Sequence, residues 1–275
     1  MIREDENISD YSFDPTEVLT EDIETNISEA DRARNVNLTA VSMLGRLSHP
    51  NIVSLLGYCI DEQDEYLLVY EYMQNRSLDK HLHPDVAAEP LSWGTRLRIM
   101  IGVARGLSYL HLSNVILRGV KPSDILLDQV FNAKLGDFRI ARSAPEIGDA
   151  DVSSTHIVGT FGYMDPKYMM TGRFSVKSDI YSFGVVLLQT LTSLKPFDMN
   201  RRREQINLVE WLSPILGDKE ELKKIIDPRL EKNYPEEGVL EYAKLALRCL
   251  AEEPEDRPSS EEVLQYLKQI DGVTK

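Results

Sequence analysis

Hydrophobic and polar positions follow two different patterns in the first third of the chain. Between residues 33 and 47, apolar side chains recur every three or four positions, which predicts a helix. His49 and Pro50 end this pattern, and two nearly continuous apolar runs follow at 52–59 and 66–72, separated by a short polar turn. Short apolar runs on either side of a polar turn predict a pair of strands.

From residue 92 onward the pattern is mostly helical. The first helix of this part is long, and its apolar face is formed by Leu97, Met100, Ile101, Ala104, Leu107 and Leu110. Further helices are predicted over 177–198, 208–216, 240–250 and 261–270. The helix at 177–198 is apolar on nearly all sides, which is typical of a helix buried in a core.

The formal net charge of the 275-residue chain is −14, and its acidic residues are unevenly placed. Residues 1–31 contain eleven Asp or Glu and one Arg, with apolar positions thinly spread among them. This composition predicts a mostly irregular acidic leader, with a short helix after Pro15 as the alternative. The negative charge argues against nucleic acid or an anionic membrane surface as a partner.

The two cysteines, Cys59 and Cys249, lie inside apolar segments, so we expect buried thiols in a reducing compartment. We find no signal peptide and no apolar run long enough for membrane insertion. The second residue is Ile2, so the acceptor glycine for N-myristoylation is absent. These features predict a cytoplasmic protein, and recruitment to the plasma membrane through a partner is compatible with them.

The segment VILRGVKPSDILLD, residues 115–128, resembles the catalytic loop of eukaryotic protein kinases, H-R-D-L-x-x-x-N followed by an apolar strand. Arg118 lies in its usual place in this motif. Leu117 replaces the histidine, Gly119 replaces the catalytic aspartate, and Asp124 replaces the asparagine that binds magnesium in the family. Since glycine has no side chain, it cannot orient a substrate hydroxyl or accept its proton.

Other motifs of the family occur in the expected order along the chain. KLGDFRIAR has Arg139 where D-F-G has its glycine, and GTFGYMDPKY has Lys167 where A-P-E has its glutamate. Asp179 and Arg257 occupy the positions that anchor the catalytic loop and form the D-R-P-S turn. The segment SHPNIVSLLGYC is similar to plant receptor-like kinases, and most of all to their cytoplasmic branch.

The resemblance implies an α+β, bilobal protein kinase-like fold with a truncated N-lobe and an intact, mostly helical C-lobe. It divides the chain into the acidic leader at 1–31, a reduced N-lobe at 32–74 and a C-lobe at 75–275. The reduced N-lobe would hold helix αC and two of the usual five strands.

Several parts of a kinase nucleotide site are missing from their expected places. The first glycine of the chain is Gly45 and the first lysine is Lys80, so no glycine-rich loop and no phosphate-binding lysine precede the predicted αC helix. Ala40 falls where αC usually carries a glutamate. The resemblance leaves a hinge remnant at Glu71, Tyr72 and Met73.

These losses together favour a catalytically inactive pseudokinase that is not an enzyme and needs no cofactor. It would act as a scaffold, adaptor or decoy in receptor-kinase or innate-immune signalling, with an active receptor-like kinase or an immune receptor as protein partner. The alternative is a weakly active or atypical serine/threonine kinase, in which Asp124 and Asp137 hold magnesium for residual Mg-ATP binding. A decaying gene product without a role is the third interpretation, and the regular apolar faces of the helices argue against it. Partner identity, pathway, contact surface and oligomeric state stay open.

Two ion contacts are predicted from the changed motifs. Arg139 is expected to pair with Asp137 or Asp124. Arg257, which pairs with the A-P-E glutamate in the family, is expected to face Lys167 as a like charge.

One strand is expected to lie at an open edge. No convincing third strand precedes the run at 66–72, so its outer edge would be covered by the leader or by a strand from a partner.

Regulation is expected at the segment that follows the D-F-G position. In the family, the arginine at position 118 binds a phosphorylated residue of this segment, and Ser153, Ser154 and Thr155 are the candidate acceptors here. The alternative is that Arg118 only braces the backbone of its own loop.

Overall fold

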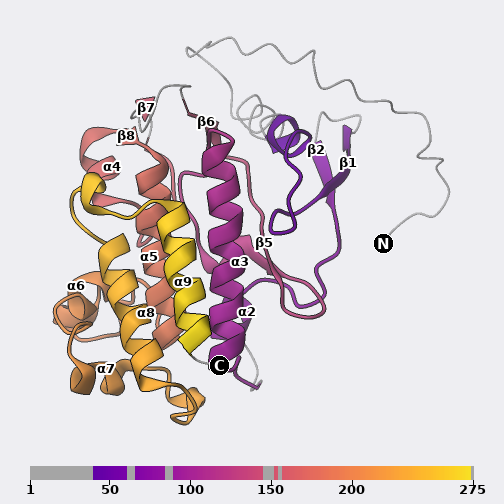
Figure 1. Cartoon of the computed structure of the whole chain (residues 1–275). Helices are drawn as coiled ribbons and strands as arrows, with labels where there is room; N and C mark the ends of the chain where they lie inside the picture. The colour runs from indigo at the N-terminus through magenta and orange to yellow at the C-terminus, as the bar shows by residue number, and fades with distance from the viewer. Residues whose placement is uncertain (1–39, 61–65, 84–88, 145–151, 154–156, 274–275) are drawn as a thin grey trace.

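The computed structural model describes residues 40–60, 66–83, 89–144, 152–153 and 157–273. In this part of the chain, a body of packed helices carries a small two-stranded sheet at one side (Figure 1). The sheet comes before residue 75 and the long helices after it. The α+β architecture predicted from the sequence is therefore confirmed.

The small sheet consists of β1 (Leu55–Ile60) and β2 (Tyr66–Tyr70), paired antiparallel with Cys59 opposite Leu67. One face of this sheet packs against the main core through Leu55, Leu68 and Tyr70. Successive side chains of a strand point to opposite faces, so the residues between them point away from the core. Residues 40–44 form part of a helix that contributes Ala40 and Leu44 to the same core. Among the described residues, β2 pairs only with β1.

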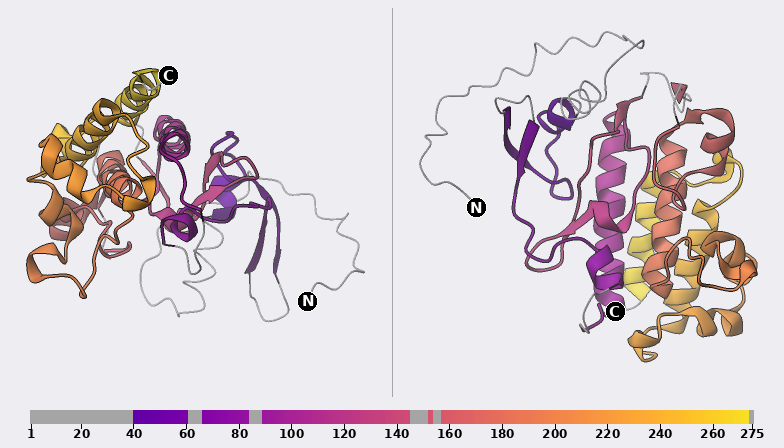
Figure 2. Two further views of the ribbon diagram at one scale, coloured as in Figure 1. Left: turned by 90° about the horizontal axis from the view of Figure 1, so that it is seen from below. Right: turned by 180° about the vertical axis from the view of Figure 1, so that it is seen from behind.

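Four long helices build the main body: α3 (Trp93–Leu112), α5 (Val176–Thr192), α8 (Glu236–Cys249) and α9 (Ser260–Val273). α3 packs against α9 and α5 packs against α8, so the four lie side by side (Figures 1 and 2). Every residue from 178 to 192 in α5 is buried, which confirms the prediction of a core helix. Its start is fixed by a capping box between Ser175 and Ser178.

The helices begin where polar side chains can bond their free N–H groups. Ser92 accepts from the Thr95 amide at the start of α3, and Asn207 accepts from two amides at the start of α6. The shorter helices are α2 (Asp79–Leu82), α4 (Pro166–Thr171), α6 (Leu208–Leu212) and α7 (Lys219–Ile225).

Six short strands form three further pairs around the loop that connects α3 to α5. These are β3 (Val115–Ile116) with β6 (Arg142–Ser143), β4 (Ile125–Leu127) with β5 (Ala133–Leu135), and β7 (Val152–Ser153) with β8 (Arg173–Phe174). All three pairs are antiparallel. The β4–β5 hairpin packs against α3 and brings the loop at 117–124 over the helical body.

Several predicted boundaries differ from the structure. The strand expected to begin at residue 52 begins at Leu55, because Val53 N–H instead donates to the Leu135 carbonyl at 2.9 Å. The helix expected over 177–198 ends at Thr192, where Ser193 adopts a left-handed conformation. The short helices α4 and α7 were not expected. The leader at 1–31 and the first part of the predicted helix at 33–47 lie outside the described residues.

The two cysteines also differ from the expectation. Cys249 is buried in α8, as predicted, and burial raises the pKa of its thiol to about 12. Cys59 is exposed, because it lies on the face of β1 that points away from the core. Cys59 and Cys249 do not form a disulfide.

Candidate functional site

The loop at 117–124 is held in shape by α5. The Asp179 carboxylate accepts hydrogen bonds from the amides of Leu117, at 2.8 Å, and Gly119, at 3.1 Å. Ser182 Oγ accepts from the Val120 amide at 2.9 Å, and His111 Nε2 lies 3.1 Å from the same aspartate. Because these bonds go to backbone amides, they do not depend on the identity of the side chain at position 117.

Gly119 leaves one position of this loop without a side chain. Its φ is +141°, a region that residues with a Cβ rarely adopt. A Cβ placed there would meet nothing within 4 Å, so the space beside it is open.

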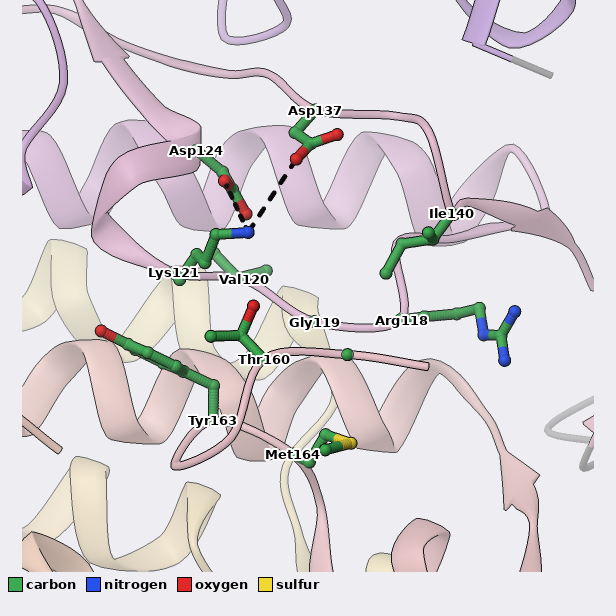
Figure 3. A pocket seen from close by; sticks show the side chains of 11 residues that line it. Arg118, Gly119, Val120, Lys121, Asp124, Asp137, Ile140, Thr160, Tyr163 and Met164 are labelled. Carbon is green, nitrogen blue, oxygen red and sulfur yellow. Dashed lines mark ion pairs between the residues drawn. The ribbon is translucent and has the colours of Figure 1, made fainter. Parts of the chain in front are cut away.

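Lys121 lies between two carboxylates at the centre of the site (Figure 3). Its Nζ is 3.2 Å from Asp124 Oδ1 and 3.9 Å from Asp137 Oδ2. Burial raises the pKa of Asp124 to about 6, although the charge of Lys121 opposes this shift. The two carboxylates therefore come together from two separate motifs, as the kinase resemblance implies.

Arg139 closes the outer side of this cluster. Its Nε and Nη2 each donate to a different oxygen of Asp137, both at 2.7 Å, and this bidentate pair lowers the pKa of Asp137. The sequence predicted that Arg139 would pair with Asp137 or Asp124, and the structure places it on Asp137.

A small pocket of about 30 Å³ lies beside the cluster and is open at one side. One wall comes from the loop at 118–124, and the facing wall comes from the segment at 159–164 (Figure 3). Gly119, Lys121 and Thr160 all border it. The pocket has room for about two water molecules, which is also enough for one small polar group of a substrate.

The hinge remnant connects the small sheet to the loop region. The Glu71 carboxylate accepts from Lys134 Nζ with both oxygens, each at 2.7 Å, and from the Ser54 amide at 2.7 Å. Met73 is buried, whereas the Tyr72 side chain is 80% exposed. The role of these three residues as a nucleotide hinge stays a prediction.

Arg118 is 6% exposed and packed among aromatic rings. Its guanidinium carbon lies 4.3 Å from the centre of the Phe174 ring, and Nη2 donates to Tyr168 Oη at 2.6 Å. Ser153 lies in β7, whereas Ser154 and Thr155 lie outside the described residues. The structure thus supports a bracing role, and phosphate binding by Arg118 stays a prediction.

The expected clash of like charges at the C-terminal end of this region does not occur. Arg257 pairs with Asp165, at 2.7 and 2.9 Å, rather than facing Lys167. Lys167 points outward and pairs with Glu253 at 2.7 Å. The prediction was wrong because it considered only the motif position 167, whereas the acid two residues earlier reaches the arginine.

Asp124 and Asp137 are the residues that could hold a magnesium ion. No group of three or more His, Cys, Asp or Glu within the described ranges is arranged to bind a metal ion. Magnesium often takes only one or two carboxylates from a protein when phosphates and water complete its shell, so the pair fits in kind and number. Lys121 and Arg139 bond to oxygens of the same carboxylates, so an entering cation would compete with both.

Two contacts of this site were not predicted from the sequence. The Glu71–Lys134 pair joins residues 63 positions apart and leaves no local signal. Asp165 did leave a signal, since an acidic residue directly before a proline is typical of a helix N-cap, and here it caps α4.

The protein kinase domain family matches residues 23–267 of the chain. This match covers most of the sequence and includes every motif described above. The chain belongs to the protein kinase domain family.

Its relatives come from the receptor-like cytoplasmic kinases of plants. The probable serine/threonine-protein kinase PBL2 of Arabidopsis thaliana is 45% identical over 240 residues, covering 86% of this chain and 56% of the relative. Serine/threonine-protein kinase PBL34 of the same plant is 47% identical over 236 residues, covering 85% and 47%. A Nicotiana benthamiana protein named EPD1-interacting receptor-like cytoplasmic serine/threonine-protein kinase is 46% identical over 239 residues, covering 86% and 51%. The chain spans about half the length of these curated relatives.

These relatives overturn the prediction of an inactive scaffold. The changed motifs favoured a pseudokinase that is not an enzyme, whereas relatives at 45% to 47% identity are named serine/threonine-protein kinases. That prediction is therefore wrong, and the expected deficiency in ATP binding has no support. Phosphoryl transfer depends mainly on positioning and electrostatic stabilisation, so a count of changed motif positions is a poor guide to activity.

No helix in the described part of the chain is both long and apolar enough to cross a membrane.

Proposed function

We propose that the chain is a serine/threonine protein kinase that transfers a phosphoryl group from Mg-ATP to a hydroxyl group of a protein. The observation that carries the proposal is the site cluster: Asp124, Asp137 and Lys121 meet beside a pocket whose loop is anchored by Asp179. The names of the relatives support the same function.

Each residue of the cluster would have its own role in phosphoryl transfer. Asp124 and Asp137 would hold the magnesium ion, which neutralises phosphate charge when bound. Lys121 carries a point charge in the lining of the pocket, where it can orient a phosphate oxygen. The walls at 118–124 and 159–164 would bind the acceptor hydroxyl and exclude bulk water.

The changed positions predict a slow enzyme. No side chain stands at Gly119, and Arg139 must release Asp137 before magnesium can use both of its oxygens. Removing one preorganised electrostatic group typically lowers a rate by a factor of about 10² to 10³. We therefore expect turnover well below that of a kinase with the full motif set.

Two further features belong to the proposal. A truncated N-lobe at 32–74 would leave the nucleotide held mostly by the C-lobe and the hinge remnant at 71–73. By analogy with the relative named a receptor-like cytoplasmic kinase, the chain would act in the cytoplasm. Recruitment to the plasma membrane through a receptor-type partner is a further part of the proposal.

The test is a phosphorylation assay with the purified full chain, labelled ATP, Mg²⁺ and a serine- and threonine-containing protein substrate. We expect slow, Mg²⁺-dependent transfer that is lost in Asp137→Ala and reduced in Lys121→Ala. Lys244→Ala, an exposed lysine of α8, is the matched control and should match the wild type. Arg139→Gly should raise the apparent affinity for Mg-ATP, because it frees both oxygens of Asp137.

Thermal unfolding provides a readout that is independent of turnover. Mg-ATP at about 100 times its Kd should stabilise the folded chain by about 2.7 kcal/mol. Absence of transfer in the wild type would refute the proposal, and a Mg²⁺-dependent thermal shift without transfer would show that the chain binds the nucleotide but is not a kinase.

A further inference from the structure

Asp165 lies at the junction between the pocket wall and the helical body. It directly follows the wall segment at 159–164, and its side chain is 2% exposed. Its Oδ1 accepts from the Lys167 amide at 2.9 Å and thereby caps α4. Its Oδ2 accepts from Ser178 Oγ at 3.0 Å, which joins it to the first turn of α5.

Arg257 completes this junction from the C-terminal part of the chain. It donates to both oxygens of Asp165, at 2.7 and 2.9 Å, in a bidentate pair that is almost fully buried. Its remaining donors bond the backbone carbonyls of Ala251, Lys177 and Glu252. All five donors of the guanidinium group are thus used, which makes this arginine a fixed point of the fold.

Lys167, two positions after Asp165, lies at the surface and does not take part in the buried pair. Lys167 is 39% exposed, and its Nζ donates to both oxygens of Glu253, at 2.7 and 2.8 Å. An ion pair that is exposed to solvent in this way contributes little to stability, because water screens the attraction between its charges. The buried pair therefore depends on Asp165, although the family motif places its acid at position 167.

We propose that Asp165 is the positioning residue that fixes the pocket wall at 159–164 against Arg257, in place of an acid at position 167. The inference deepens the proposed function, on which it rests for its link to substrate binding. Asp165 touches no substrate; it acts by holding Thr160 and Tyr163 at the distance from Gly119 and Lys121 that an acceptor hydroxyl needs.

The proposal can be tested by moving the carboxylate from position 165 to position 167. The double variant Asp165→Asn/Lys167→Glu moves the carboxylate from position 165 to position 167, directly after Pro166. There it can form the ion pair with Arg257 in place of Asp165. The single variant Asp165→Asn lacks the negative charge but keeps the size of the side chain, so it should fold even where Asp165→Ala does not. A buried charge that loses its partner is strongly destabilising, so the local effect of the single variant should be large.

The first measurement is amide hydrogen exchange of the full-length protein at residues 159–164. We expect exchange there to be faster by about tenfold or more in Asp165→Asn, and to return toward the wild-type rate in the double variant. Asp218→Ala is the matched control, because Asp218 caps α7 through two amides and pairs with no buried arginine in the described part of the chain. It should leave exchange at 159–164 unchanged.

The second measurement is steady-state kinetics with a serine-containing peptide. Because Asp165 positions the wall rather than the reacting atoms, Asp165→Asn should raise KM about tenfold with kcat nearly constant, and the double variant should restore KM. A purely structural role would lower the active fraction and leave KM unchanged.

Each outcome decides the question. Unchanged exchange at 159–164 in Asp165→Asn, or faster exchange that the double variant does not reverse, overturns the role of Asp165. If the wild type transfers no phosphate, the proposed function fails, while the exchange series still decides whether Asp165 fixes the wall.

Discussion

Asp124 carries its charge in surroundings that disfavour it. Its side chain is 11% exposed, and burial outweighs the nearby ammonium group of Lys121, so its pKa rises from 3.8 to about 6. The folded state therefore holds this proton more tightly than the unfolded chain does. Stability from this group is fully present below about pH 4 and is lost as the pH rises through about 6.

Asp124→Asn should remove this loss, because an amide has no charge to desolvate. We expect the variant to be more stable than the wild type by about 1–2 kcal/mol at pH 7, with a smaller difference at pH 5. Urea unfolding at the two pH values measures the effect. A gain of equal size at both values would show that the carboxylate charge is not its cause.

Single residues also show where sequence reasoning succeeds and where it fails. The pair of Arg139 with Asp137 was predictable, because the two residues lie two positions apart and the motif fixes their backbone. The partner of Arg257 was not predicted, because the family motif directed attention to Lys167, whereas Asp165, two residues earlier, forms the pair. Local charge pairs thus follow from sequence more readily than pairs formed across the fold.

At the scale of elements, the long periodic helices were predicted well. α8 and α9 each bury one face, and α3 is buried along most of its length, so the apolar residues of all three recur at helical spacing and identify them directly. The two-residue strands β3 and β6 are too short for any pattern, and their pairing depends on tertiary position. The loop at 117–124 was recognised by its motif, whereas its anchoring by Asp179 was expected only from the family resemblance.

The packing of α3 against the β4–β5 hairpin depends on a helical glycine. A Cβ at Gly106 would lie 2.9 Å from the Asn51 carbonyl oxygen and 2.9 Å from Leu135 Cδ1, so the helix must shift to admit one. We expect Gly106→Ala to destabilise the protein by about 1–3 kcal/mol. Gly94→Ala in the same helix meets nothing within 4 Å and should be stabilising by up to about 1 kcal/mol. Chemical denaturation measures both, and equal shifts would contradict the packing argument.

At the scale of the whole molecule, the chain divides into a small sheet region and a large helical body. The sequence predicted this division, because the two regions differ in apolar period. It also predicted an open strand edge, and in the described residues β2 has β1 as its only neighbour. Leu67 and Val69 are 58% and 52% exposed on that strand, and its five residues include no charge.

Strands that lack charge at an open edge tend to add further strands, which leads to aggregation. Leu67→Lys should therefore raise the concentration at which the protein aggregates, while its free energy of unfolding changes by less than about 0.5 kcal/mol. Leu112→Lys is the matched control, since Leu112 is 82% exposed at the end of α3. Light scattering during a concentration series separates the two variants. Equal protection by both would indicate a general effect of charge rather than one of the edge.

The backbone conformation of Gly119 makes a return to aspartate at this position unfavourable. At its φ of +141° any residue with a Cβ is strained, by about 1–3 kcal/mol, so a single mutation cannot return an aspartate to this position at no cost. The loop must first rotate its backbone, and the hydrogen bonds that the Leu117 and Gly119 amides donate to Asp179 oppose that rotation. The change to glycine is thus easily made and hard to reverse, so descendants of this sequence are expected to improve catalysis through other residues instead.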